Sequence, residues 1–157
     1  MNPLMQIRPM RWWDIEQVAA LESEIFTESR WTTEQFWSEL AQPTRTYVVV
    51  EDPGPDEQGI IGYAGLFVLG AESDVQTIAV APTARGRGIG RVLMEHLMAS
   101  AREQGATQMI LEVRADNEPA IALYQGLGFE VISSRRDYYA PGIDARIMRI
   151  RPLVQAP

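Results

Sequence analysis

The sequence predicts an α/β fold in which helices cover the faces of one central mixed β-sheet. Segments rich in β-branched residues, such as 46–50, alternate with segments whose apolar residues recur at helical spacing, such as 89–104. Glycines, prolines and capping residues separate these segments. The expected element order is β-α-α-β-β-β-α-β-α-β-β, typical of a mixed sheet with helices on its faces. A chain of 157 residues suits one domain, 1–157, with a sizeable core.

Two helices are expected in the first part of the chain. The first spans residues 13–26, and its apolar side chains fall near one face (Trp13, Val18, Leu21 and Ile25). The second begins after Thr32 or Thr33, because threonine is a good N-cap. Its apolar side chains are expected to turn inward (Phe36, Trp37 and Leu40).

Seven strands are expected. They span residues 5–9, 46–50, 59–69, 74–80, 108–114, 129–134 and 145–151. A loop at 52–57 separates the second strand from the third, because its two prolines and one glycine would break a ladder of hydrogen bonds. The third and fourth strands should pair as a hairpin around Gly70-Ala71-Glu72.

Two more helices are expected in the second part of the chain. The helix over 89–104 carries one apolar stripe (Ile89, Val92, Leu93, Leu97 and Ala101) and stops at Gly105. His96 falls near the edge of this stripe and is interpreted as structural. The next helix is capped by Asp116 or Asn117 and runs to about Leu127, with Gly128 as its stop.

The run from Arg85 to Gly90 predicts an anion site. It follows an apolar strand and precedes an amphipathic helix, so unpaired backbone N–H groups and the positive end of the helix dipole meet there. Gly86, Gly88 and Gly90 let the backbone approach a diphosphate closely and can supply positive φ. Arg85 and Arg87 add positive charge. The alternative is a surface turn that happens to be rich in arginine and glycine.

Two common phosphate motifs do not fit this run. A P-loop would end in Gly-Lys-Ser or Gly-Lys-Thr, whereas this run ends in Gly90-Arg91-Val92. A dinucleotide fingerprint would read G-x-G-x-x-G, which the glycine spacing does not match. The pattern present is R-x-x-G-x-G, and the ligand implied is a different phosphate-bearing cofactor.

Composition excludes several classes of function. With no cysteine and one histidine, the chain has no disulfide, thiolate metal site, cysteine nucleophile or histidine-rich metal site, and we expect no metal. A net charge of −7 argues against nucleic acid as the main partner. No apolar run approaches about 18 residues and no secretory signal is evident, so we expect no membrane partner and a cytoplasmic location.

The order of motifs after residue 74 resembles the GCN5-related N-acetyltransferase family, which binds acetyl-coenzyme A. The R-x-x-G-x-G loop is followed by Leu111-Glu112-Val113-Arg114, Asn117, Ala120 to Tyr124, Leu127-Gly128-Phe129 and Arg135 to Tyr139. The loop alone indicates only the superfamily. The later motifs are similar to its RimI-type branch, the ribosomal-protein alanine N-acetyltransferases. The resemblance implies the fold of that family and acetyl transfer from a thioester to an amine.

The resemblance implies that Glu112 is the general base and Tyr124 the general acid. Glu112 lies on an alternating strand amid apolar residues, where partial burial would raise its pKa toward a useful value. The alternative is a surface glutamate paired with Arg114. The phenol of Tyr124 has a reference pKa of about 10 and a thiol one of about 8.5, so proton transfer from the phenol to the departing thiolate is mildly unfavourable. The alternative for Tyr124 is simple packing on Phe129.

The same resemblance implies how the coenzyme is held. The end of the strand over 74–80 binds the pantetheine arm through its backbone, and the glycine-rich loop over 85–90 binds the diphosphate. An N–H of the strand end, that of Val80, would donate to the oxyanion. Asn117 contacts the coenzyme, although it is also a good helix N-cap. The implied coenzyme-binding residues are Ile78, Ala79, Val80, Arg85, Gly86, Arg87, Gly88, Ile89, Gly90, Arg91 and Asn117.

Aromatic residues are expected to frame the acceptor. Tyr138 and Tyr139 follow two arginines in a loop before the last strand, and the resemblance implies that this loop frames the acceptor peptide. The alternative is an ordinary aromatic plug of a hairpin. Trp31-Thr32 stands where relatives often carry Pro-Trp-Ser, and Arg30 replaces that proline, so this wall of the acceptor site differs.

The implied acceptor is the α-amine of an N-terminal alanine, in small-subunit ribosomal protein eighteen. An α-amine with a pKa of about 7.8 is roughly one quarter neutral at pH 7.4, whereas a lysine amine is only about 0.1% neutral, so a single carboxylate suits the first better. Protein lysine or a small-molecule amine remains an alternative, and a non-catalytic acetyl-CoA-binding module a remoter one. We expect a monomer or a weak dimer.

Overall fold

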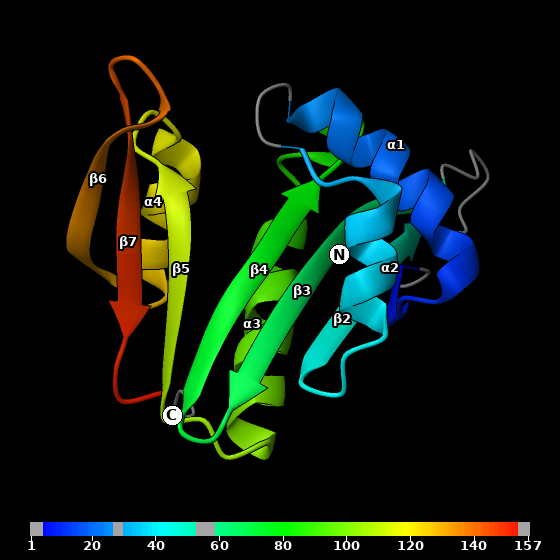
Figure 1. Ribbon diagram of the computed structural model, residues 1–157, viewed down its shortest axis with the longest axis horizontal. Helices are drawn as coiled ribbons and strands as arrows, with labels where there is room; N and C mark the ends of the chain where they lie inside the picture. Colours follow the sequence, from blue (N-terminus) through cyan, green and yellow to red (C-terminus); the bar gives the residue numbers. More distant parts are fainter. Residues whose placement is uncertain (1–4, 27–29, 53–58, 154–157) are drawn as a thin grey trace. The chain divides into compact units, whose positions relative to one another are not determined.

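The computed structural model describes residues 5–26, 30–52 and 59–153 (Figure 1). The chain forms two compact units. Unit 1 comprises Met1–Phe67 and Gln76–Leu97, and unit 2 comprises Val68–Val75 and Met98–Pro157. The seven strands are hydrogen-bonded in the order β1-β2-β3-β4-β5-β7-β6, so the predicted mixed sheet with flanking helices is confirmed.

Unit 1 contains the strands β1 (Gln6–Pro9), β2 (Arg45–Asp52) and β3 (Gly59–Leu69) and most of β4 (Glu72–Val80). Strand β2 runs antiparallel to both β1 and β3. Four consecutive residues of β2, from Tyr47 to Val50, are buried, because helices cover both faces of this part of the sheet. Strand β4 starts at Glu72, two residues earlier than the sequence predicts, and follows Gly70 and Ala71 directly.

Helices cover both faces of β3. Tyr63 contacts α1 (Ile15–Ile25) and α2 (Thr33–Leu40) through Glu22 and Phe36. A side chain at the neighbouring Gly62 would instead meet Ile89 and Leu93 of α3 (Ile89–Glu103). Successive residues of a strand point to opposite faces, so α1 and α2 lie on one face of β3 and the start of α3 on the other.

Two tryptophans predicted to lie in the core are exposed. Trp13 belongs to a 3-10 turn over Trp12–Asp14 rather than to α1 and is 60% exposed. Asp14 holds this turn, because its carboxylate accepts hydrogen bonds from the Arg8 guanidinium and from the Arg11 N–H. Trp37 is 50% exposed and stacks on Trp12, while its neighbour Phe36 is fully buried. Adjacent positions of a helix point about 100° apart, so Trp37 can face solvent while Phe36 faces the core.

The Tyr47 side chain occupies the space that Gly65 leaves open. The two residues face each other across β2 and β3, and the Tyr47 phenol donates a 2.8 Å hydrogen bond to Glu39. A Cβ atom at Gly65 would lie 2.3 Å from the Tyr47 ring. The glycine is therefore needed for close approach of a ring, not for a special backbone angle.

We expect Gly65→Ala to lower the free energy of unfolding by about 1–3 kcal/mol, because the buried ring has to move. Gly126→Ala is the matched control, because Gly126 ends a helix and no atom lies within 4 Å of the added Cβ. It should leave stability unchanged or raise it by up to about 0.5 kcal/mol. Denaturant unfolding of both variants checks this, and equal stabilities would contradict the role assigned to Gly65.

Unit 2 contains the first residues of β4, then β5 (Gln108–Arg114), β6 (Glu130–Ala140) and β7 (Ile143–Ile150). Strand β5 is parallel to β4 and antiparallel to β7, which pairs with β6. Helix α4 spans Glu118–Gly126. Helix α3 begins in unit 1 and ends in unit 2. Its buried side chains are Ile89, Leu93, Met94, Leu97, Met98 and Ala101.

Strand β6 is longer than predicted and includes both tyrosines that the sequence places in a loop. The sequence predicts a strand over 129–134, but the structure continues it to Ala140. Asp137 holds the extension: it has a left-handed φ of 54°, its carboxylate accepts the Gly142 N–H at 2.7 Å, and its own N–H donates to Asp144. Tyr138 and Tyr139 therefore lie on an irregular strand end beside β7.

Among the described residues, no helix combines the length and the apolar character needed to cross a membrane.

Candidate active site

The glycine-rich loop of unit 1 has the backbone geometry that the sequence predicts. A 3-10 turn over Pro82–Ala84 follows β4, and α3 starts at Ile89. Gly86 and Gly88 adopt left-handed φ values of 79° and 78°, and no atom lies within 4 Å of a Cβ built on either. Gly90 lies in the first turn of α3 instead. The loop therefore presents bare backbone to the space in front of it.

The start of α3 supplies backbone donors to that space. The first hydrogen bond of the helix runs from the Val92 N–H to the Gly88 carbonyl at 3.1 Å. The preceding N–H groups of Ile89, Gly90 and Arg91 have no intrahelical acceptor at a helix N-terminus. Together with the positive end of the helix dipole, they can bind a diphosphate.

The three arginines of the loop differ in their contacts. The Arg85 guanidinium reaches the Val80 carbonyl at 3.4 Å, Arg87 lies 3.4 Å from the Asp52 carboxylate, and Arg91 pairs with Glu95. All three are exposed. Asp52 offsets part of the positive charge of Arg87, and Glu95 offsets part of that of Arg91. The contact of Arg85 is with a neutral carbonyl, so its charge is better available to a diphosphate.

At the end of β4, the backbone of Ile78 to Val80 is the group predicted to bind the coenzyme, and not the side chains. Ala79 is buried, while Ile78 and Val80 are half-buried. The Ala79 carbonyl lies 3.2 Å from the position of a Cβ on Gly62, and Ala81 donates to the Ile61 carbonyl. The β3 side of this segment is thus closely packed against Gly62.

In unit 2, Glu112 lies on the more exposed face of β5. Met109, Leu111 and Val113 are buried and the residues between them are not, which confirms the predicted alternation. The Glu112 side chain is 31% exposed on this face, so it is partly buried, as the sequence predicts. Glu112 forms an ion pair with Arg135 on β6, 3.6 Å away.

Arg114 takes part in a different arrangement. Its guanidinium pairs with Asp116 at 3.0 Å and lies over the Tyr139 ring, 5.4 Å from the centroid. Arg135 lies over the Tyr138 ring in the same way, at 5.3 Å. The two tyrosine rings meet edge to face. Two arginines and two tyrosines thus form a connected surface beside Glu112.

Tyr124 is buried in unit 2. Burial raises its pKa to about 12, and the neighbouring Tyr139 contributes. Its ring packs against Phe129, 6.1 Å between centroids, so the predicted packing contact exists. The phenol keeps its proton over the whole physiological range, as a general acid requires.

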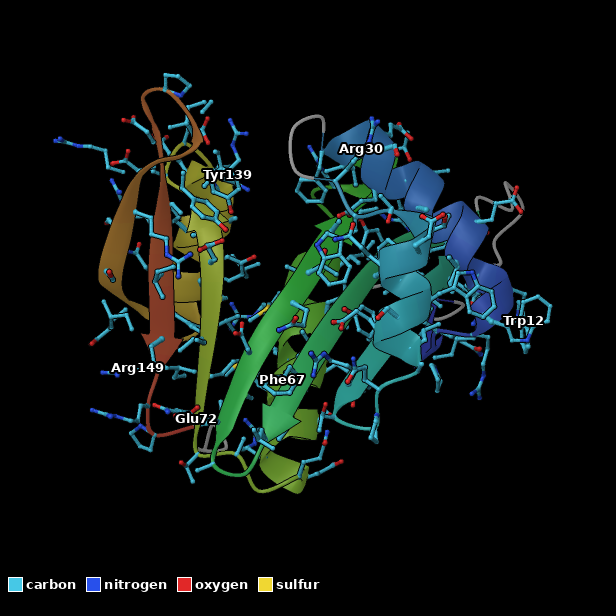
Figure 2. All side chains as sticks on the ribbon, viewed as in Figure 1. Trp12, Arg30, Phe67, Glu72, Tyr139 and Arg149 are labelled. Carbon is cyan, nitrogen blue, oxygen red and sulfur yellow. The ribbon has the colours of Figure 1, made fainter. Side chains whose placement is uncertain are left out.

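Tyr139 links the two predicted catalytic residues. Burial raises its pKa to about 12, and the negative charge of Glu112 adds to the effect. Tyr139 also raises the pKa of Tyr124, so it lies within electrostatic range of both predicted catalytic residues. Figure 2 shows Tyr139 beside the end of β5 that leads toward α4. Glu112, Tyr124 and Tyr139 all belong to unit 2.

Asn117 is the N-cap of α4. Its side-chain oxygen accepts the Ala120 N–H at 3.3 Å, and Pro119 occupies the first turn. The capping role that the sequence predicts is confirmed. The Asn117 side chain is exposed, which leaves its amide group accessible to a ligand.

Trp31 lies in unit 1, just before the N-cap of α2. Its ring is half-buried and packs against Phe36 and Tyr47, with centroids 5.4 and 6.2 Å apart. Its backbone N–H donates to Glu22 at 3.3 Å. Sequence reasoning missed Glu22, although one signal was present: a carboxylate four residues after Val18 falls on the apolar stripe of the helix.

The described residues contain no cluster of histidine, aspartate and glutamate suited to a metal ion. His96 is exposed on α3 rather than packed.

The sequence pattern of the acetyltransferase (GNAT) family matches residues 11–129. The chain belongs to this family. The resemblance seen in the motifs is therefore confirmed, and the protein is a GNAT acetyltransferase.

Individual GNAT relatives match most of the chain. The N-alpha-acetyltransferase RimI of Mycobacterium tuberculosis is 40% identical over 142 residues, 87% of this chain and 85% of the relative. The putative [ribosomal protein bS18]-alanine N-acetyltransferase of Bacillus subtilis is 35% identical over 144 residues, 90% of this chain and 92% of the relative. An uncharacterized Mycobacterium leprae protein is longer: the match is 43% identical but spans only 38% of that relative.

The fold agrees with a solved GNAT structure. The crystal structure of the ribosomal-protein-S18-alanine N-acetyltransferase from Escherichia coli superposes with a TM-score of 0.84 and 28% identity, covering 97% of this chain and 96% of that one.

Proposed function

We propose that this acetyltransferase moves the acetyl group of acetyl-CoA to the α-amine of an N-terminal alanine, that of the small-subunit ribosomal protein bS18. The observation that carries the proposal is the similarity to relatives named for this reaction, which extends over nearly their full length in Bacillus subtilis and Escherichia coli. Acetyl-CoA is the co-substrate of the family, and the open glycine loop suits its diphosphate.

The loop and the strand end hold the coenzyme in this proposal. Backbone N–H groups at the start of α3 and the Arg85 guanidinium bind the diphosphate. The backbone of Ile78, Ala79 and Val80 pairs with the pantetheine arm, and the Val80 N–H donates to the oxyanion. Asn117 contacts the coenzyme through its exposed amide group.

Glu112 acts as the general base. It takes a proton from the α-amine, directly or through a water, as the nitrogen attacks the thioester carbonyl. The exposed face of β5 keeps this carboxylate accessible, and Arg135 holds it in place. Trp31, Tyr138 and Tyr139 frame the acceptor peptide. The absence of cysteine from the sequence agrees with direct attack, without an acyl-enzyme intermediate.

Tyr124 acts as the general acid and protonates the departing thiolate. Its pKa of about 12 lies well above that of a thiol, so the proton moves only as the C–S bond breaks. We expect Tyr124→Phe to lower kcat by about 10²-fold, with the KM for acetyl-CoA nearly unchanged. Tyr139→Phe is the comparison and should raise the acceptor KM more than it lowers kcat. Steady-state kinetics decide, and equal effects of the two variants would contradict this assignment.

The proposed acceptor is tested with two synthetic peptides. One begins with alanine and carries the N-terminal sequence of bS18, and the other is the same peptide blocked at its N-terminus and bearing an internal lysine. Mass spectrometry after incubation with acetyl-CoA should find acetylation of the free N-terminus alone. Acetylation confined to the lysine would remove the α-amine from the proposal, and turnover of small amines alone would favour a small-molecule acceptor.

A further inference from the structure

Glu22 is a carboxylate in a place that disfavours negative charge for two reasons. Its side chain is buried, with 1% of the residue exposed. It also lies in the last turn of α1, where the negative end of the helix dipole repels an anion. In the part of unit 1 that the structure describes, no ion pair compensates this charge.

Two neutral donors hold the Glu22 carboxylate. The Tyr63 phenol, fully buried on β3, donates to one oxygen. The Trp31 backbone N–H donates to the other at 3.3 Å. Burial raises the pKa of Glu22, while these two hydrogen bonds lower it. The carboxylate therefore bridges β3 and the residue that precedes the N-cap of α2.

Of the two residues that Glu22 joins, Tyr63 is buried and Trp31 is partly exposed, so only Trp31 can contact a ligand directly. Trp31 is half-buried, and its ring packs on Phe36 and Tyr47. Thr32 then caps α2 in a reciprocal arrangement with Gln35. The hydrogen bond from the Trp31 N–H to Glu22 thus restrains the backbone that carries the half-buried ring.

We propose that Glu22 is a positioning residue for the acceptor, which acts by fixing the backbone of Trp31. The inference rests on the proposed function, in which Trp31 forms part of the acceptor wall. Glu22 itself touches no substrate, because both it and Tyr63 are buried. A carboxylate that only filled space here would be a poor choice, since an apolar side chain of similar size carries no desolvation penalty.

Three variants test the role of Glu22. Glu22→Leu removes both acceptor oxygens, whereas Glu22→Gln keeps an oxygen for the Trp31 N–H. Glu24→Leu is the matched control, because Glu24 is an exposed glutamate of the same helix. Each protein is prepared with 5-fluorotryptophan, which gives one fluorine signal for each of the four tryptophans. Trp31→Phe assigns the signal of Trp31.

We expect Glu22→Leu to raise the KM for an alanine-initiated peptide by about 10-fold or more, from the loss of one buried hydrogen bond, with the KM for acetyl-CoA within about twofold. The fluorine signal of Trp31 should shift or broaden while the signals of Trp12, Trp13 and Trp37 stay in place. Glu22→Gln should remain within about threefold of the native acceptor KM. If Glu22→Leu does not fold, Tyr63→Phe, which removes the other donor, should show the same pattern to a smaller degree.

The outcomes separate this inference from the proposed function. If the native enzyme acetylates the peptide but Glu22→Leu leaves the acceptor KM and the Trp31 signal unchanged, the inference is overturned and the function stands. A parallel loss in kcat and in both KM values, seen equally in Glu22→Gln, would show a merely structural residue and also overturn it. If the native enzyme does not acetylate the peptide, the function fails, and the Trp31 signal alone decides whether Glu22 positions that residue.

Discussion

Glu112→Gln is expected to lower kcat by about 10²–10⁴-fold while the dissociation constant of acetyl-CoA stays nearly unchanged. Glutamine keeps the size and hydrogen-bonding shape of the side chain but cannot accept a proton at neutral pH. Because Glu112 lies on the open face of β5, away from the buried residues of that strand, the substitution leaves the packing of unit 2 intact. The loss therefore reports the chemistry rather than the fold.

The ion pair with Arg135 requires a control of its own. Glu112→Gln also frees the Arg135 guanidinium, which lies over the Tyr138 ring. Arg135→Gln breaks the same ion pair but leaves the carboxylate, so it should lower kcat far less than Glu112→Gln. Glu130→Gln, an exposed glutamate on β6, should have no effect. Single-turnover measurements at neutral pH decide, and normal turnover in Glu112→Gln would remove Glu112 from the role of base.

The parts of the site that depend on local sequence were predictable. Gly86 and Gly88 adopt the left-handed backbone that the sequence predicts. A tight turn between a strand and a helix often needs a positive φ, which glycine adopts without steric cost. The alternation along β5 was equally readable, because a strand has a period of two. The N-cap at Asn117 follows from the chemistry of a single side chain.

The parts that depend on distant contacts were not predictable. Glu22 meets Tyr63 across 41 residues of chain, and Glu112 meets Arg135 on another strand, so neither partner is visible in a local pattern. The extension of β6 depends on how Asp137 bonds to Gly142 and Asp144. Trp13 and Trp37 were assigned to the core by their apolar character, although large aromatic residues also occur at surfaces.

Gly88→Trp is expected to abolish measurable binding of acetyl-CoA. The position of a Cβ on Gly88 is open space in the protein, with no atom within 4 Å, so the indole would not clash with the chain itself. It would instead fill the region in front of the first N–H groups of α3, which the diphosphate needs. The two effects, on the ligand and on the fold, are thus separable at this residue.

Backbone strain is the competing explanation, because Gly88 has a φ of 78°. Gly70→Trp is the matched control: Gly70 has a φ of 61°, is equally open, and lies in the turn between β3 and β4. Both variants should lose about 1–2 kcal/mol of stability from the left-handed backbone, and only Gly88→Trp should lose the coenzyme. Gly88→Ala adds the same strain without bulk and should bind acetyl-CoA more tightly than Gly88→Trp. Calorimetric titration measures each affinity, and equal binding by Gly88→Trp and Gly70→Trp would mean that the diphosphate is bound elsewhere.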